Sequence, residues 1–360
     1  MSTVIADDTF QTLVRTLRQM PEVDCPDAWP AVQMDLVAKA GGNRWNIPRK
    51  YGGDGVDPIE LLEIYRELAI GSLLTTFILT QRNSACQRIE TSGNTALVEK
   101  LLPAMCRGEL FATVGISHLT TSRQHLQAPS VAVTPESTGD GFRMNGSVPW
   151  ATAALQADLI VTGGSLPDGR QVLAAVPTDR EGVTVQTPIS LMGLSSSQTS
   201  MVELHNVFIS TDEVLHGPVE KVMTASTGGG AGSLGTSAVA IGAAQGTLLR
   251  FAHEVERRPE LAEFHQPLDN EARELAHQLR ESAAGRQVGG IYSPESIRQR
   301  ANSLVLRAAQ AWLGSTKGAG YIAGHPAERA VRESMFFLVW SCPQLVLEGN
   351  LRELSCATGD

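Results

Sequence analysis

The chain has 360 residues, a formal net charge of −9 and a hydrophobic share of 42%. This length allows two or three domains with separate cores, and the composition is typical of a globular protein. The acidic balance argues against a nucleic-acid surface, which needs a basic stripe, and no apolar run is long enough to span a bilayer.

The N-terminal sequence MSTVIADDTFQ lacks the basic and apolar blocks of a secretion signal. The five cysteines are odd in number and scattered, with no C-x-x-C pair. This pattern predicts reduced thiols and a cytoplasmic location rather than a disulfide framework.

Residues 1–110 are predicted to form an all-α domain, because their apolar residues mostly recur every three or four positions. A long helical stretch begins at Ile59, and a second begins at Ala96, where Pro103 is predicted to break it. Between the first helices, the glycines of NIPRKYGGDGVD (46–57) indicate an irregular turn.

Residues 111–222 are predicted to form an antiparallel β-barrel or sandwich. Short alternating segments such as SVAVTP, ADLIVTGG, QVLAAVP and MVELHNVFI are separated by turns rich in Gly, Pro, Asp and Ser. Many short strands of period two with regular turns are typical of that architecture.

Residues 223–360 are predicted to form a four-helix bundle after a glycine-rich linker that starts at Ser226. The helices are expected to begin near Ser233, Leu268, Pro294 and Ala327, and the last to run to about Glu353. The linker contains G-x-G-x-x-G at 230–235, but no strand precedes it, so we interpret it as a hinge rather than a phosphate-binding loop.

One strand end carries a pair of side chains suited to a planar ligand. In GSVPWAT (146–152), Trp150 and Thr152 are two residues apart and project from the same face of a strand. The indole offers a flat apolar wall and the hydroxyl a hydrogen bond, which together suit a ring with polar edges such as a flavin isoalloxazine. A strand that simply buries a tryptophan is the alternative.

Six fragments follow one another in order over nearly the whole chain: IPRKYGGDGVD, SGNTALVEKLLPAMCRGEL, GDGFRMNGSVPWAT, LMGLSSSQTSMVELHNVFI, SAVAIGAAQGTLLRFA and KGAGYIAGHPAERAVRE. Together they resemble segments of the acyl-CoA dehydrogenase superfamily. The resemblance implies an α+β multidomain fold with an N-terminal all-α domain, a middle β-barrel and a C-terminal four-helix bundle. It also implies a homodimer or homotetramer.

The resemblance further implies that Trp150 and Thr152 contact a flavin ring. Ser117 occupies the place of a family threonine and would add a hydrogen bond near that ring.

The segment with which the family holds the flavin's diphosphate across the subunit interface, on the adenosine side, is only loosely echoed by Arg257, Arg258 and Phe264. The resemblance also makes Gly318 and Gly320 of a later run cofactor-binding candidates. The implied cofactor is FAD, with FMN or a transiently bound reduced flavin left open.

The expected catalytic carboxylate is missing. The family's usual Glu position falls at Ser341 and Cys342, and its second known position falls at Gly232 and Ser233. His118, next to Ser117, is a candidate base, since a neutral imidazole works near pH 7. A half-buried structural histidine is equally compatible. Cys342 is a weaker candidate, because no basic residue near it in sequence would lower its thiol pKa.

Arg329 and Arg332 lie three residues apart on one helical face. They could hold a phosphate or a carboxylate, but we favour ion pairs with Glu328 or Glu333. The histidines and carboxylates show no metal-ligand spacing, so no metal site is expected.

The leading hypothesis is a flavin-dependent oxidoreductase that acts on an acyl thioester or a related small carbonyl compound with a base other than Glu. The first alternative is a two-component monooxygenase on the same fold, which takes reduced flavin from a separate reductase. The second is a catalytically silent binding or assembly subunit. A flavin reductase or an electron acceptor is therefore an expected partner, and nucleic acid and membrane are not.

Overall fold

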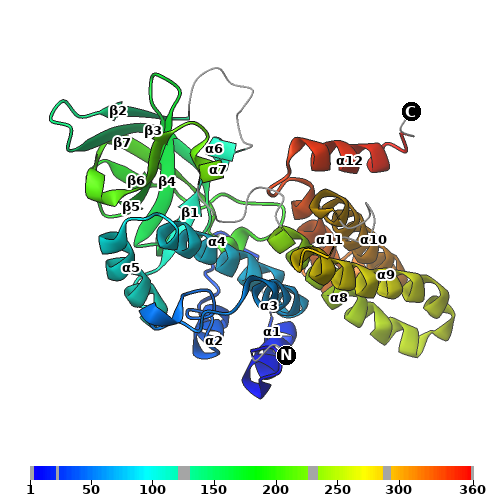
Figure 1. The fold of residues 1–360 in the computed structure, drawn as a ribbon. Coiled ribbons are helices and arrows are strands. Elements are labelled where there is room, and N and C mark those ends of the chain that lie inside the picture. Colours follow the sequence, from blue (N-terminus) through cyan, green and yellow to red (C-terminus); the bar gives the residue numbers. More distant parts are fainter. Residues whose placement is uncertain (1–3, 22–23, 121–129, 226–233, 287–292, 358–360) are drawn as a thin grey trace.

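The structure is a computed structural model that describes residues 4–21, 24–120, 130–225, 234–286 and 293–357. N-terminal helices are followed by a central β-sheet and then by C-terminal helices (Figure 1). This arrangement confirms the predicted fold class. No helix within these described ranges is long and apolar enough to cross a membrane.

The N-terminal region contains five α-helices: α1 (Asp8–Gln19), α2 (Ala31–Lys39), α3 (Pro58–Gly71), α4 (Leu73–Glu90) and α5 (Thr95–Arg107). The stretch predicted from Ile59 is thus two helices. They are divided at Ser72, whose extended backbone ends α3 and whose hydroxyl accepts a hydrogen bond from the amide of Thr75 to cap α4.

The prediction that Pro103 breaks its helix is wrong, since α5 runs through it. A proline removes one backbone hydrogen bond, to the carbonyl four residues earlier. That carbonyl belongs to the exposed Glu99, where water can take the place of the missing donor.

The central sheet contains eight strands: β1 (Ala112–Gly115), β2 (Val131–Pro135), β3 (Gly141–Ala151), β4 (Leu159–Ser165), β5 (Gln171–Pro177), β6 (Val183–Val185), β7 (Ser200–Ser210) and β8 (Val214–Val219). Their order is β6-β7-β3-β2-β4-β5-β8, with β1 added on β4. The sheet is mixed rather than wholly antiparallel as predicted, because β4 pairs in parallel with β1 and, at one position, with β2. Alternation of apolar residues reports which side chains are buried but not the direction of the neighbouring strand.

The C-terminal region contains α8 (Leu234–Arg257), α9 (Ala262–Ala283), α10 (Pro294–Gly320), α11 (Pro326–Ser334) and α12 (Gln344–Leu354). The fourth predicted helix is therefore interrupted. After α11 a 3-10 turn (Met335–Leu338) follows, and α12 starts only after Pro343. Proline disfavours helical backbone at the residue before it, which here is Cys342. The preceding residue, Ser341, adopts a left-handed backbone with φ +46°.

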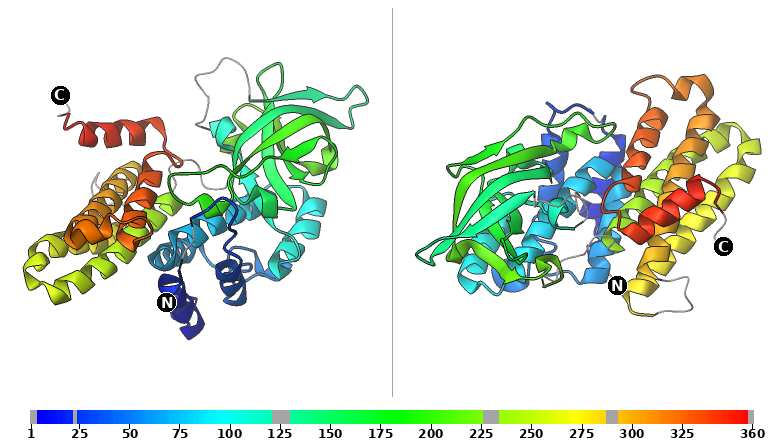
Figure 2. Two further views of the ribbon diagram at one scale, coloured as in Figure 1. Left: turned by 180° about the vertical axis from the view of Figure 1, so that it is seen from behind. Right: turned by 90° about the horizontal axis from the view of Figure 1, so that it is seen from above.

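The N-terminal helices lie between the sheet and the C-terminal helices (Figure 2). One hydrophobic core is shared by α1, α3 and α4 with α8, α9 and α10. Helices α3 and α8 approach most closely at Gly242, where a Cβ atom would lie 2.0 Å from the carbonyl oxygen of Arg66. This shared core holds α3 and α4 in place between the sheet and the C-terminal helices.

The structure also has two short α-helices, α6 (Ser117–Thr120) and α7 (Val222–Ala225), and short 3-10 helices at Ala154–Gln156 and Ser195–Ser197. The linker residues 226–233, including Gly232 and Ser233, lie outside the described residues. The hinge hypothesis for that segment therefore stays a prediction.

Candidate functional site

A cavity of about 1520 Å³ lies where the sheet, helices α3 and α4 and the segment after α11 meet. Protein pockets for one small ligand usually hold about 300–1,000 Å³. The cavity is therefore larger than a usual pocket for one small ligand, and it draws its lining residues from all three regions of the fold.

Strand β3 delivers the indole of Trp150 to the cavity. The pairing of β3 with β7 is irregular between Val148 and Ala151, and such bulges re-aim side chains. Trp150 lines the cavity and leaves 46% of its surface exposed. A large apolar side chain that is half uncovered on a cavity wall is suited to stacking against a planar ligand.

Thr152 lies one residue beyond β3 and lines the same cavity. Its hydroxyl is 3.2 Å from that of Thr199, which in turn is 2.9 Å from the hydroxyl of Ser197. The carbonyl of Thr152 accepts a hydrogen bond from Thr113. These contacts hold Thr152 in place at the cavity that Trp150 also lines.

Ser117, at the start of α6, also lines the cavity. Its hydroxyl oxygen is shielded from solvent and has no hydrogen-bond partner within the described part of the chain. A buried hydroxyl without a partner costs free energy, so this group is suited to a ligand atom. Trp150, Thr152 and Ser117 define what we call the sheet wall.

A cluster of three aromatic side chains also lines the cavity, and we call it the helical wall. Phe77 lies on α4, and Phe336 and Trp340 lie on the segment after α11. The ring centroids of Phe77 are 4.8 Å from Phe336 and 5.1 Å from Trp340, and the last two stack at 5.0 Å. Sequence reasoning missed this wall, although the aromatic run MFFLVW was a usable signal.

No Asp or Glu lines the cavity among the residues that the structure places, and the charged groups there are Arg88, Lys221 and Arg332. The undescribed segments that follow the lining residue Thr120 and precede the lining residue Leu234 also contain no Asp or Glu in their sequences. Arg332 is paired with Glu328 at 2.5 Å and with Asp24.

Arg329 pairs with Glu333 at 3.5 Å. Ion pairs of Arg329 and Arg332 with Glu333 and Glu328 were the expected partners, and the structure confirms them. Neither pair leaves a carboxylate facing the cavity.

The three predicted catalytic residues are not brought together. His118 does not line the cavity, and its Nε2 donates a hydrogen bond of 2.8 Å to the carbonyl oxygen of Gly163. Ser341 does line the cavity. Cys342 does not; burial raises the pKa of its thiol, and the side-chain amide of Asn350 lies 3.8 Å from its sulfur.

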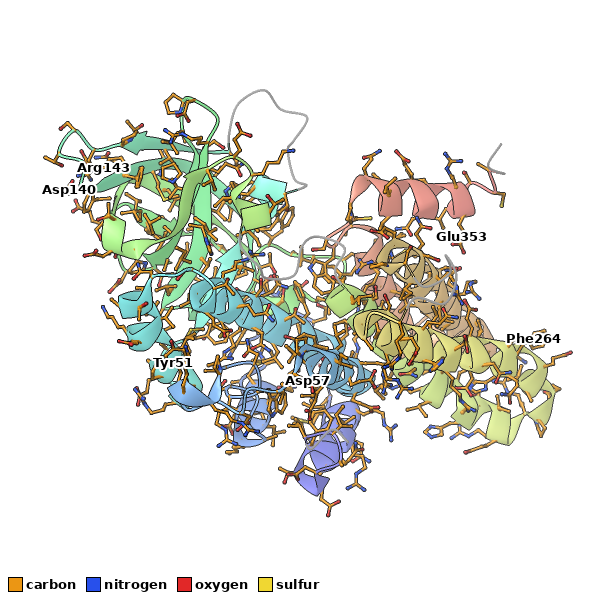
Figure 3. All side chains as sticks on the ribbon, viewed as in Figure 1. Tyr51, Asp57, Asp140, Arg143, Phe264 and Glu353 are labelled. Carbon is orange, nitrogen blue, oxygen red and sulfur yellow. The ribbon has the colours of Figure 1, made fainter. Side chains whose placement is uncertain are left out.

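The four residues expected near the adenosine half of a flavin lie away from this cavity. Phe264 is 58% exposed at the outer end of the bundle (Figure 3). Arg257 is exposed and pairs loosely with Glu254 at 3.6 Å. Gly318 and Gly320 lie at the end of α10, after a kink at Lys317. None of the four lines the cavity of its own chain.

The residues of the sheet wall fit a flavin ring. The indole supplies a flat surface, and Thr152 and Ser117, the latter with a hydroxyl that has no partner within the described residues, line the same cavity. The described residues contain no group of three or more His, Cys, Asp and Glu side chains placed to hold a metal ion.

Comparison with known proteins gives one family and several relatives. The family "Acyl-CoA dehydrogenase, N-terminal domain" matches residues 8–109. Dibenzothiophene monooxygenase of Rhodococcus qingshengii is 27% identical over 177 residues, which are 48% of this chain and 42% of that protein. The chain thus spans less than half the length of that relative.

A second relative, 3-(aryl)acrylate reductase of Clostridium sporogenes, is 27% identical over 252 residues, covering 69% of this chain and 65% of that protein. Among solved structures, butyryl-CoA dehydrogenase from Megasphaera elsdenii has a TM-score of 0.80 at 17% identity, covering 97% of this chain and 98% of that one. This last likeness shows the fold.

Relatives of this chain include both acyl-CoA dehydrogenases and flavin monooxygenases, and members of the family bind FAD or FMN. The family match falls on the N-terminal helices, and the likeness of fold extends over the whole chain. The chain is a distant member of the acyl-CoA dehydrogenase superfamily of flavin-dependent oxidoreductases.

Proposed function

We propose that this protein is a monooxygenase that uses reduced flavin from a separate reductase and acts on an apolar, aromatic substrate. The observation that carries this proposal is a cavity that combines an indole and hydroxyl residues on its sheet wall with no carboxylate in its described lining. Dehydrogenation of an acyl thioester needs a base that removes the α-proton. Monooxygenation does not, and this requirement distinguishes the two reactions.

Among the lining residues that the structure describes, no group supplies such a base. The ring of His118 is turned to the carbonyl of Gly163 and is absent from the lining. Ser341 offers only a neutral alcohol, and burial keeps the thiol of Cys342 protonated. A monooxygenase does not have to remove an α-proton, so the missing carboxylate is no obstacle to it.

The flavin would rest on Trp150, with the hydroxyls of Thr152 and Ser117 beside its polar edges. Reduced flavin supplies two electrons and two protons, so that one atom of O₂ enters the substrate and the other leaves as water. The protein's own part is to hold the ring, orient the substrate and exclude bulk water from the reacting atoms.

The helical wall would hold the substrate. Phe77, Phe336 and Trp340 present aromatic faces and edges to the same cavity, and aromatic pairs of this kind contribute about 0.5–1.5 kcal/mol each beyond the buried area. The dibenzothiophene monooxygenases among the relatives support an aromatic substrate, because their name describes such a reaction.

A homodimer or homotetramer is part of the proposal. Arg257, Phe264, Gly318 and Gly320 do not line the cavity of their own chain, so a role for them in holding flavin requires a neighbouring copy. Contacts of this kind would bind the adenosine half of FAD. FMN has no adenosine half and would need only the sheet wall to be held.

An anaerobic titration with a thioester and a separate oxygenation assay with ¹⁸O₂ test the proposal. Protein loaded with oxidised FMN or FAD is mixed with butyryl-CoA and, separately, with photoreduced flavin, a panel of aromatic compounds and ¹⁸O₂. We expect no bleaching by the thioester and a product that carries one ¹⁸O atom. Bleaching of bound flavin by butyryl-CoA without oxygen would establish the dehydrogenase instead, and failure to bind either flavin would favour a silent subunit.

A further inference from the structure

One arginine of the C-terminal helices lies wholly inside the fold. Arg298 is on the second turn of α10, and its side chain is 0% exposed. Burial lowers the pKa of its guanidinium to about 10, because the charged form is held away from water. Within the described residues its Nε and Nη1 have no hydrogen-bond partner, and its Nη2 donates to a backbone carbonyl. A cation buried in this way costs free energy, so its neighbours must explain its presence.

The carbonyl that Arg298 contacts belongs to Trp340, at a hydrogen-bond distance of 2.8 Å. In a continuous helix this carbonyl would accept a hydrogen bond from the amide of Gln344. Here the helix is interrupted, because Ser341 adopts a left-handed backbone with φ +46° and α12 begins only at Gln344. Arg298 therefore supplies the donor that the interrupted helix lacks.

Further contacts connect Arg298 with the rings of the helical wall. The amide of Trp340 donates a hydrogen bond of 2.9 Å to the carbonyl of Phe336, so the backbone of Trp340 is held on both sides. The buried ring of Phe337 packs against both the guanidinium and the indole. Its centroid is 6.0 Å from Cζ of Arg298 and 6.2 Å from the ring of Trp340. Arg298 thus contacts the segment that places Phe336 and Trp340 at the cavity.

Stability alone does not account for an arginine at this place. An apolar side chain of similar length would avoid the loss of hydration, and replacing buried charged groups by apolar ones is often neutral or stabilising. The guanidinium adds a directed, charge-assisted hydrogen bond to one carbonyl. That carbonyl belongs to a residue that lines the cavity, so the contact bears on the shape of the cavity.

We propose that Arg298 is a positioning residue for the substrate: through the carbonyl of Trp340 it holds the helical wall in the shape that receives an aromatic ring. It acts from behind the wall, since it does not itself line the cavity. This inference rests on the proposed function for the class of substrate. The placement of Trp340 is measured without ligand or turnover.

The first test is a ¹⁹F NMR spectrum of the protein labelled with 5-fluorotryptophan, in which the Trp340→Phe variant identifies the resonance of Trp340. We expect Arg298→Met to shift or broaden that resonance, because the peptide group that carries the indole loses its donor. Arg298→Lys keeps a cationic donor and should stay closer to the wild type. Arg300→Met is the matched control, because Arg300 lies on the same helix but bonds to Gln278 of α9, and it should leave the resonance unchanged.

The second test connects this placement with substrate binding. The protein with saturating oxidised FMN and no reductant is titrated calorimetrically with 2-naphthalenemethanol and with its saturated decahydro analogue. We expect Arg298→Met to weaken binding of the aromatic alcohol about tenfold, to weaken the saturated analogue less and to leave FMN affinity unchanged. Because Arg298 acts through Trp340, the double variant Arg298→Met with Trp340→Ala should bind no more weakly than Trp340→Ala alone.

Two results would overturn the inference. One is a Trp340 resonance that Arg298→Met leaves as in the wild type. The other is that the losses of the two single variants add in the double variant, since Arg298 would then act by a route other than Trp340. Folding is checked by circular dichroism, and Arg298→Gln, with its shorter neutral side chain, takes the place of Arg298→Met if that variant does not fold. If the wild type does not bind 2-naphthalenemethanol, the proposed substrate class fails, and the resonance still decides the role of Arg298.

Discussion

The sheet wall and the helical wall of the cavity differ in how their residues come together. Trp150 and Thr152 are neighbours in the sequence, and one bulged strand end places both. Phe77 and Phe336 are separated by most of the chain and meet only because α4 and the segment after α11 pack together. The sheet wall is a local sequence motif that a flavin-binding fold can retain. The helical wall depends on the interruption of the helix between α11 and α12.

This difference assigns separate tasks to the two walls. The sheet wall has a half-exposed indole and a hydroxyl without a partner in the described residues, which are features of a surface that awaits a ligand. The helical wall is already packed ring on ring, so it supplies a shaped apolar surface. Substitutions in the two walls should therefore change flavin binding and substrate binding separately.

The largest effect is expected at Trp150. Trp150→Ala removes the flat surface under the ring, and stacking of a base on an aromatic side chain contributes about 1–3 kcal/mol, so FMN affinity should fall about 10- to 100-fold. Equilibrium titration of FMN measures it, and Trp150→Phe should recover most of the affinity. Unchanged retention by Trp150→Ala would remove the sheet wall from the flavin site.

Phe336→Ala is expected to act on the substrate instead. It removes aromatic contacts with Phe77 and Trp340 at 4.8 and 5.0 Å, so KM for the aromatic substrate should rise about tenfold while FMN affinity stays within about twofold. Tyr321→Ala, at a residue that is 81% exposed, is the matched control. An equal loss of FMN and substrate binding would mean that the two walls do not act separately.

His118 is expected to position the α6 turn that carries Ser117, through its hydrogen bond to the carbonyl of Gly163. His118→Gln can still donate that bond and should keep most of the turnover, whereas His118→Leu should lower kcat several-fold without loss of FMN. If Gln and Leu lower kcat equally and the pH profile loses a limb near neutrality, the imidazole acts as a base after all.

Cys342 is expected to show the smallest effect. Burial raises the pKa of its thiol, so less thiolate is present at a given pH, and alkylation at pH 8 should be several-fold slower than at the exposed Cys356. Mass spectrometry of iodoacetamide-treated protein measures both rates. Cys342→Ser should keep turnover; rapid labelling of Cys342 together with an inactive serine variant would restore it as a catalytic candidate.

Features that depend on one segment of the chain could be predicted from the sequence, and features that depend on contacts between distant segments could not. The order of helical, sheet and helical regions was readable from the hydrophobic period. The parallel pairing of β1 with β4, the division at Ser72 and the continuity of α5 through Pro103 were not, because they depend on neighbours that a single segment does not encode. The aromatic cluster likewise appears only when distant segments pack together.

The most direct measurement is a crystal structure of the protein grown with excess FMN. We expect the isoalloxazine ring on the indole of Trp150, with the hydroxyls of Thr152 and Ser117 within hydrogen-bond distance of its edges and the aromatic cluster still open to a second ligand. A ring bound elsewhere, or a cavity filled by the protein's own side chains under saturating FMN, would contradict the proposed flavin site.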